Sequence, residues 1–268
     1  MGPKWYCSNW WKSSRLGTRA ETAHYKSIVA YDGTAFQGFQ RQKRGSRTVQ
    51  GTLEQALTKL GWEARSLKAA GRTDAGVHAL GQVVAYELVW SREPDRLTEA
   101  LNSCLPSDVA VRHTALVAAD FHPRFSALGR RYSYRLMLSK RADPMVERFA
   151  WRIWPQPEFD RLAEAARLFV GEHDFGAFGR PPVPGGHTVR RIGRAEWQVD
   201  GDRLCLWLEA NAFLNRMVRR VVAAIVQVGW GIRTLEEIQI RIKDPSSMWP
   251  GRPAPAKGLC LEEVFYAS

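Results

Sequence analysis

The sequence predicts an α+β fold, in which helices are layered on a β-sheet. Two observations predict it. Strand-like and helix-like segments alternate between residues 25 and 118 in the order β-α-β-α-β. Later in the chain, Asp200-Gly201-Asp202 separates two strand-like segments, and such an Asp-Gly connection is a strong signal for a β-hairpin. Because a helix or sheet with one apolar face must cover that face with another element, these segments are expected to pack in layers.

The N-terminal end carries no pattern of regular structure. Residues 1–23 contain Gly, Ser, Arg and Lys without helical or strand periodicity, which predicts a basic, disordered tail. The fold is expected to begin near His24. Residues 25–31 alternate and are rich in strand formers, and the Asp-Gly-Thr at 32–34 predicts a turn after them.

The rest of the N-terminal half, which we take as residues 24–119, alternates helices with strands. Thr48 has the position of a helix N-cap, apolar residues follow it at helical spacing, and Gly61 ends the pattern. No phosphate loop or Gly-x-Gly-x-x-Gly pattern occurs here, so the usual nucleotide cofactors are not expected. The remaining predicted elements are a strand over 81–90, a helix over 94–104 and a strand over 108–118.

A second half is expected over residues 120–268. It begins with a strand at 130–138, in which Tyr132 and Leu136 lie on an apolar face and Arg131 on a basic one. The other predicted elements are a helix over 158–170, a loop over 171–178, an exposed loop over 179–187, strands over 189–199 and 203–210, a helix over 213–228, a helix that opens with a capping box at Thr234, and a strand over 259–265.

The charge balance favours a polyanionic partner. The 268 residues carry a formal net charge of +12, and the sequence pI is about 9.9. For a chain without an amphipathic membrane helix, this surplus indicates nucleic acid first. No apolar run reaches membrane-spanning length, and the N-terminal stretch lacks the apolar core of a signal peptide, so we expect a cytoplasmic protein.

The cysteine pattern predicts neither a disulfide framework nor a metal centre. The four cysteines lie far apart, with no Cys-x-x-Cys pair and no histidine at ligand spacing. Cys205 and Cys260 lie in apolar strand-like runs and are expected to be small core residues.

The strongest candidate for chemistry lies between residues 70 and 79. There Gly71 and Gly76 bracket an Arg-Thr-Asp-Ala stretch just ahead of a strand. Glycines at this spacing let the backbone turn sharply and let another molecule approach closely, so the carboxylate of Asp74 can be offered to a ligand. The alternative is a tight turn in which the aspartate hydrogen-bonds its own backbone.

A loop over 36–47 is dense in basic side chains. Two phenylalanines at its start are followed by Arg41, Lys43, Arg44 and Arg47. This composition suits contacts with phosphates. The alternative is a solvated charged loop without a partner.

Six motifs follow one another from about residue 24 to the C-terminus. They are YDGTAFQGFQ at 31–40, GRTDAGVH at 71–78, FHPRFSA at 121–127, RYSY at 131–134, GEHDF at 171–175 and FLNRMVR at 213–219. Together they resemble the tRNA pseudouridine synthase A family, and APAKGL at 254–259 is similar to its closing motif. The resemblance implies a pseudouridine synthase fold, with two RNA-recognition-like α+β halves that share a mostly antiparallel sheet and enclose a central cleft.

The resemblance also implies an activity and its residues. Members isomerise uridine to pseudouridine in the anticodon stem-loop of tRNA, at positions 38, 39 and 40, without metal or organic cofactor, and act as homodimers. Asp74 matches the essential catalytic aspartate, and Arg72 matches the arginine implicated in flipping the target base. Tyr132 matches the tyrosine that stacks on the uracil, and Arg219 matches the basic partner of the aspartate. Arg131, on the basic strand face, is a further candidate for RNA contact.

These residue types fit the implied chemistry. Uridine must lose its N1–C1′ bond, turn, and rejoin through C5, and a carboxylate can serve by attacking C1′ or by taking a proton from C2′. Both routes stay open. The base must leave its stack, and the ring of Tyr132 compensates for that loss. Arg219 would keep Asp74 ionised, and the phenol of Tyr132 is a further candidate for removing the C5 proton.

Three other functions remain open at the level of the sequence. A non-catalytic RNA-binding protein would share the basic loops but would not need Asp74. A metal-dependent nuclease would use Asp74 with carboxylates such as Asp32 or Asp174, and would need a divalent cation. An N-glycosidase would attack C1′ in the same way and release free uracil. His78 and His173 are expected to be structural.

Overall fold

The computed structural model describes residues 22–42 and 45–267. The predicted disordered tail lies outside the described residues, except for its last two, which begin the first strand. The strands are β1 (Thr22–Tyr31), β2 (Lys68–Ala69), β3 (His78–Val89), β4 (Val109–Leu116), β5 (Gly129–Leu138), β6 (Trp151–Ile153), β7 (Gly171–Asp174), β8 (Val189–Asp200), β9 (Arg203–Ala210) and β10 (Leu259–Phe265). The helices are α1 (Val49–Lys59), α2 (Pro94–Cys104), α3 (Pro144–Glu147), α4 (Phe159–Arg167), α5 (Met217–Gly229) and α6 (Leu235–Lys243), with 3₁₀ turns η1 (Gly33–Ala35) and η2 (Ala256–Gly258).

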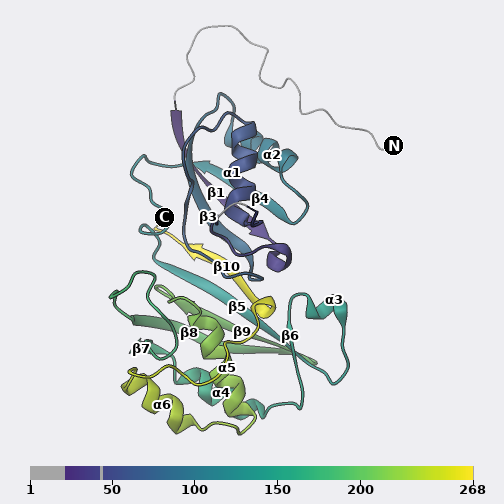
Figure 1. The fold of residues 1–268 in the computed structure, drawn as a ribbon, viewed down its shortest axis with the longest axis vertical. Helices are drawn as coiled ribbons and strands as arrows, with labels where there is room; N and C mark the ends of the chain where they lie inside the picture. The colour runs from purple at the N-terminus through teal and green to yellow at the C-terminus, as the bar shows by residue number, and fades with distance from the viewer. Residues whose placement is uncertain (1–21, 43–44, 268) are drawn as a thin grey trace.

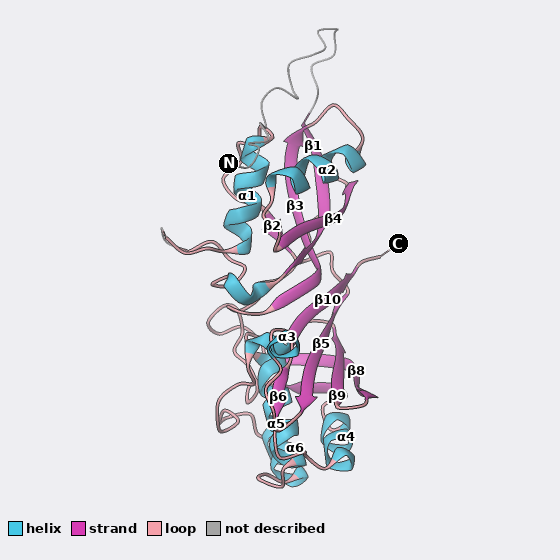
Figure 2. Ribbon diagram, turned by 90° about the vertical axis from the view of Figure 1, so that its right-hand side faces the viewer, coloured by secondary structure: helices cyan, strands magenta, loops and turns pink. Residues whose placement is uncertain are grey.

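All the described strands join one sheet, in the order β4-β1-β3-β10-β5-β9-β8-β7, with β2 beside β3 and β6 beside β5. Only the β10–β3 and β5–β6 pairs are parallel, so the prediction of a mostly antiparallel α+β sheet is confirmed. Figures 1 and 2 show α1 and α2 beside the N-terminal strands and α4, α5 and α6 beside the C-terminal strands. No helix in the described part of the chain is long and apolar enough to cross a membrane.

The N-terminal helices form where local signals place them. The hydroxyl of Thr48 accepts a hydrogen bond from the backbone N–H of Gly51, which caps α1. Gly61 follows the helix with a φ of +90°, a left-handed conformation that glycine adopts without strain. One buried cluster, which includes Leu53, Leu57 and Leu97, joins α1 and α2 to the strands.

Three boundaries in the C-terminal part differ from the predictions by more than one residue. Helix α4 ends at Arg167 rather than at 170. Residues 171–174 form β7 rather than loop, because they pair with the first residues of β8. The long helix α5 begins at Met217 rather than at 213. Arg216 has a φ of +61°, and Asn215 exchanges backbone hydrogen bonds with Arg180, which holds the preceding residues out of the helix. The short elements β2, α3 and β6 were not predicted.

Strand β10 connects the two ends of the molecule (Figure 1). It lies between β3 and β5, and its Leu261 and Val264 belong to the N-terminal apolar cluster, whereas Leu259 belongs to the C-terminal one. At Gly81 of β3, a Cβ atom would collide with the backbone of Glu262, so this junction requires a glycine.

Candidate active site

The loop that carries Asp74 connects β2 to β3, and hydrogen bonds at the residue before Asp74 hold it in place. The hydroxyls of Thr73 and Tyr31 are hydrogen-bonded at 2.8 Å, and both side chains are buried. The backbone N–H of Phe39 donates to the carbonyl of Thr73 at 3.0 Å. Since both contacts involve the residue before Asp74, they fix the direction in which the carboxylate leaves the loop.

Glycines outside this loop allow it to sit close to neighbouring backbone. A Cβ atom at Gly33 would collide with the carbonyl group of Val77, and a Cβ at Gly38 would lie 3.0 Å from the carbonyl oxygen of Thr73. Within the loop, Gly76 has a φ of +77°. The predicted need for glycine in a sharp turn beside Asp74 therefore holds at Gly76.

Arg219, in the first turn of α5, binds the carboxylate directly. Its Nη1 donates to Oδ2 of Asp74 at 2.7 Å, and its Nε donates to the carbonyl oxygen of Ala254 at 2.7 Å. The N–H of Ala254 in turn donates to the carbonyl of Arg219 at 2.9 Å. The arginine is thus held at both its backbone and its guanidinium. Its side chain is 17% exposed and that of Asp74 is 28% exposed, so the pair is partly shielded from water.

A second arginine near the carboxylate escaped the sequence analysis. The Nε of Arg216 lies 4.0 Å from Oδ2 of Asp74, and the side chain is more than half exposed. Its left-handed backbone, just before α5, turns the chain so that it and Arg219 approach Asp74 from the same element. The signal was present in the sequence, because Arg216 lies inside the motif that contains Arg219.

The four predicted catalytic residues line one cleft of about 520 Å³, together with residues from both ends of the molecule. Arg72 is exposed there and has no hydrogen-bond or ion-pair partner among the described residues. Tyr132 contacts both apolar clusters, and its ring meets Phe213 edge-on with 5.1 Å between centroids. The structure therefore brings Asp74, Arg72, Tyr132 and Arg219 together in one cleft.

The chemistry of Tyr132 follows from its surroundings. Burial raises the pKa of this phenol to about 12. The charge of Arg130 acts in the opposite direction, and that of Asp74 acts in the same direction as burial. At neutral pH the hydroxyl is therefore protonated, and the fraction present as phenolate is very small.

The described residues of the predicted RNA-binding set lie outside this cleft. Arg41 pairs with Glu54, and Arg47 makes two hydrogen bonds to Asp108. Arg131 pairs with two carboxylates, those of Glu209 and Glu263. Lys43 and Arg44 lie outside the described residues. The cleft instead contains four arginines that the sequence analysis did not select: Arg124, Arg130, Arg190 and Arg216.

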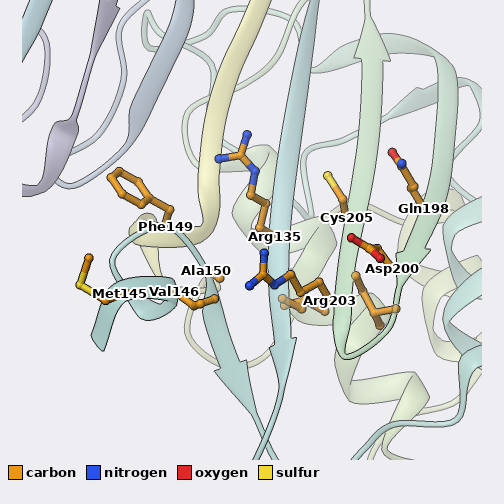
Figure 3. Close-up of a pocket in the computed structure, with 11 residues that line it drawn as sticks. Arg135, Met145, Val146, Phe149, Ala150, Gln198, Asp200, Arg203 and Cys205 are labelled. Atoms are coloured by element: carbon orange, nitrogen blue, oxygen red, sulfur yellow. The ribbon is translucent and has the colours of Figure 1, made fainter. Parts of the chain in front are cut away.

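A second pocket, of about 390 Å³, lies on the other face of the sheet (Figure 3). It is lined by Arg135 of β5 and Cys205 of β9, whereas Tyr132 and Tyr134 point to the opposite side of β5. Arg135 is already paired with Glu262. No predicted catalytic residue lines this pocket.

The histidines and the other candidate carboxylates have structural contacts. His78 is buried, its Nδ1 accepts a hydrogen bond from Gly33, and burial lowers its pKa. The Nε2 atom of His173 is hydrogen-bonded to the carbonyl of Val170.

The two other candidate carboxylates are also occupied. Asp32 accepts a hydrogen bond from Arg148, and Asp174 accepts one from the backbone N–H of the residue two positions later. Within the described residues, no group of three or more His, Cys, Asp or Glu side chains is placed to hold a metal ion.

Comparisons with known proteins decide the family. A family model described as tRNA pseudouridine synthase matches residues 28–126 and 165–267. The tRNA pseudouridine synthase A of Geobacter sp. (strain M21) is 38% identical over 242 residues, which cover 90% of this chain and 98% of that protein. The chain belongs to the tRNA pseudouridine synthase family. The corresponding enzyme of Pseudothermotoga lettingae is 39% identical over 245 residues, which cover 90% of this chain and 99% of that protein.

The family assignment makes the protein an isomerase with the pseudouridine synthase fold. A similar solved structure is that of a Cbf5-Nop10-Gar1 complex, at 13% identity and a TM-score of 0.32, covering 75% of this chain and 54% of that one. The assignment rests on the sequence similarity.

Proposed function

We propose that this pseudouridine synthase modifies uridines 38, 39 and 40 in the anticodon stem-loop of tRNA, and that Asp74 is its essential catalytic residue. The observation that carries the proposal is the 2.7 Å ion pair between Asp74 and Arg219, in a cleft that also contains Arg72 and Tyr132. A charge-assisted hydrogen bond at this distance fixes the position of the carboxylate in the cleft.

The carboxylate has two routes to the same product. In one, an oxygen of Asp74 attacks C1′ of the target nucleotide as the N1–C1′ bond breaks, and C5 later displaces it. In the other, the carboxylate takes a proton from C2′ as the N1–C1′ bond breaks, which leaves a glycal, and it returns that proton to C2′ when C5 bonds to C1′. In both, the detached uracil turns, C5 bonds to C1′, and the proton on C5 is lost. Both routes are compatible with a carboxylate held by Arg219.

Arg72 and Tyr132 would contact the flipped base. Arg72 has no partner within the described chain, so its guanidinium is free to replace contacts that the base loses when it leaves the helix. The ring of Tyr132, held edge-on by Phe213, offers its face for stacking on uracil. Because its pKa is raised to about 12, the phenol would have to lose its own proton before it could accept one from C5.

The wider RNA surface and the assembly belong to the same proposal. Arg41, Lys43, Arg44, Arg47 and Arg131 are proposed to contact tRNA away from the target base, in a cytoplasmic homodimer that needs no cofactor. For the described members, binding would require that phosphates compete with the carboxylates that now pair with them. The chain is proposed to divide into a tail at 1–23 and halves at 24–119 and 120–268.

The test is release of tritium from tRNA that carries uridine labelled at C5, because reattachment through C5 expels that hydrogen. Wild type should release tritium, and Asp74→Asn should release none while still binding tRNA. Asp120→Asn, which removes an exposed carboxylate outside the cleft, serves as the matched control and should retain full activity.

Other outcomes identify other functions. Free uracil in the product would favour an N-glycosidase, and cleaved RNA whose formation a chelator prevents would favour a nuclease. If wild type and Asp74→Asn both bind tRNA and neither releases tritium, the protein is an RNA-binding protein without this activity.

A further inference from the structure

Arg190, at the start of β8, carries a buried charge that is paired with no carboxylate in the described part of the chain. Its side chain lines the cleft, and the residue is only 7% exposed. Its Nη1 donates to the carbonyl oxygens of Val189 (2.6 Å) and His187 (3.2 Å) and contacts Nδ1 of His187 at 3.1 Å. Its Nε is buried without a hydrogen-bond partner among the described residues.

Arg130, in β5, also lines the cleft, where its side chain is half-buried. Its guanidinium donates to the carbonyl oxygens of Asn211 (2.9 Å), Ala70 (3.1 Å) and Arg124 (2.9 Å), all of them neutral acceptors. Burial lowers its pKa, as it lowers that of Arg190, and the exposed charge of Arg124 acts in the same direction on both. All three arginines line the same cleft, and Arg130 is hydrogen-bonded to the backbone of Arg124.

This arrangement is unfavourable without an anion. Leaving one member of a buried ion pair without its partner costs several kcal/mol, and buried guanidinium groups are normally matched by a carboxylate or phosphate. The carboxylate of the cleft, Asp74, is already bound by Arg219. The fork of a guanidinium matches the oxygens of a phosphate, and Arg is preferred over Lys where such an anion is bound with fixed geometry.

We propose that Arg190, Arg130 and Arg124 form a subsite for a backbone phosphate of the RNA strand whose target uridine lies at Asp74. This inference rests on the proposed function, because the same cleft is assigned to the target base. A phosphodiester next to that base would enter the cleft with it, and would match the three cations. The subsite fixes where the strand lies as the base leaves its stack.

The first experiment measures binding of an anticodon stem-loop RNA as a function of salt, with every variant made in an Asp74→Asn background so that no reaction occurs. Arg190→Gln should weaken binding at least tenfold and reduce the slope of log K against log salt by about 1, the change expected for one lost phosphate contact. Arg191→Gln is the matched control, because its exposed side chain is next along β8 and does not line the cleft. It should change neither quantity.

The second experiment finds the phosphate. It uses a series of stem-loops, each with one neutral methylphosphonate linkage. At one linkage beside the target uridine, the neutral RNA should bind the Asp74→Asn protein more weakly than the unmodified RNA does. The protein that also carries Arg190→Gln should bind the two RNAs equally. If Arg190→Gln loses affinity at every linkage as the parent protein does, the subsite is absent. If Arg190→Gln unfolds at the assay temperature, Arg190→Lys replaces it, and it should keep the salt slope but bind more weakly.

The binding experiments and the tritium-release assay separate this inference from the function it rests on. Tritium release by wild type is measured independently, so a protein that shows the linkage pattern but no release would retain the subsite and lose the proposed function. Inorganic phosphate alone is added as a competitor. If inorganic phosphate displaces the stem-loop at the same phosphate concentration as competing RNA does, the three arginines bind free phosphate rather than the strand.

Discussion

Arg219 holds the carboxylate of Asp74 with one nitrogen and the carbonyl of Ala254 with another. A lysine keeps the charge at this position but has a single terminal nitrogen, so it cannot keep both contacts in one geometry. We predict that Arg219→Lys lowers the rate of tritium release by roughly 10- to 100-fold, since a hydrogen bond to a charged group contributes about 1.5–3 kcal/mol.

The neighbouring arginine supplies the comparison. Arg216 lies 4.0 Å from the same carboxylate oxygen and is more exposed, so its interaction is weaker and more screened. Arg216→Lys should therefore reduce the rate by less than Arg219→Lys does. Equal losses in the two variants would mean that net charge alone, rather than the contact made by Arg219, supports the carboxylate.

Tyr132 allows the ring and the hydroxyl to be tested separately. If the ring stacks on the target base, Tyr132→Ala should weaken binding of the stem-loop by about 1–3 kcal/mol, the usual contribution of one stacked base. Tyr132→Phe keeps the ring and its edge-on contact with Phe213, and should bind within about twofold of wild type. Fluorescence titration in the Asp74→Asn background measures both. Weak binding by the phenylalanine variant would assign the affinity to the hydroxyl.

At the scale of an element, η1 and the Asp74 loop pack so closely that a methyl group does not fit. In Gly33→Ala, the new Cβ would meet the carbonyl of Val77, and the loop would have to move. Overpacking of this kind costs about 1–3 kcal/mol, so thermal unfolding should occur at lower temperature and tritium release should slow.

Gly193→Ala is the control for this change. Nothing lies within 4 Å of a Cβ at Gly193, and its φ is not in the left-handed region. It should leave both the unfolding temperature and the rate close to wild type. If Gly33→Ala behaves in the same way, the loop is free to yield to the added methyl group.

Elements with strong local signals could be predicted from the sequence. The capping box of α6, in which Thr234 and Glu237 bond each other's backbone, and the hairpin at Gly201 lie where they were expected. Strand β7 was not predictable, because its four residues are a strand only through pairing with β8. The start of α5 was displaced by a left-handed residue, Arg216, whose conformation depends on a distant backbone contact.

The candidate site likewise contains residues that the sequence could indicate and one that only the fold reveals. Asp74, Arg72, Tyr132 and Arg219 lie in recognisable motifs, so the sequence indicated them before their contacts were known. Arg190 could not be selected from sequence. What distinguishes it from the other arginines is its burial and its missing partner, and both depend on the complete fold.

For the molecule as a whole, buried tyrosines set a limit at alkaline pH. Burial raises the pKa of Tyr86 and of Tyr132 to about 12, and raises those of Tyr31, Tyr134 and Tyr266 as well. An unfolded tyrosine titrates near 10, so the folded protein binds protons more tightly. This contribution to stability is complete below pH 10 and is lost as the pH rises toward 12 and beyond.

Thermal unfolding between pH 8 and 12 measures this effect. The unfolding temperature should fall steeply above pH 10, together with the absorbance change of ionising tyrosine. A constant unfolding temperature over that range would mean that these phenols reach solvent while the protein is folded.

The position of β10 sets the order in which a newly made chain becomes an enzyme. Cys260 and Leu261 pair with the two residues of β3 that follow the Asp74 loop, and the other edge of β10 pairs with β5. During synthesis on the ribosome, both core clusters can begin to form before residues 259–265 exist, but no strand then joins β3 to β5. We therefore expect activity to arise last, when this strand leaves the ribosome, and a chain that ends before it to be inactive on RNA.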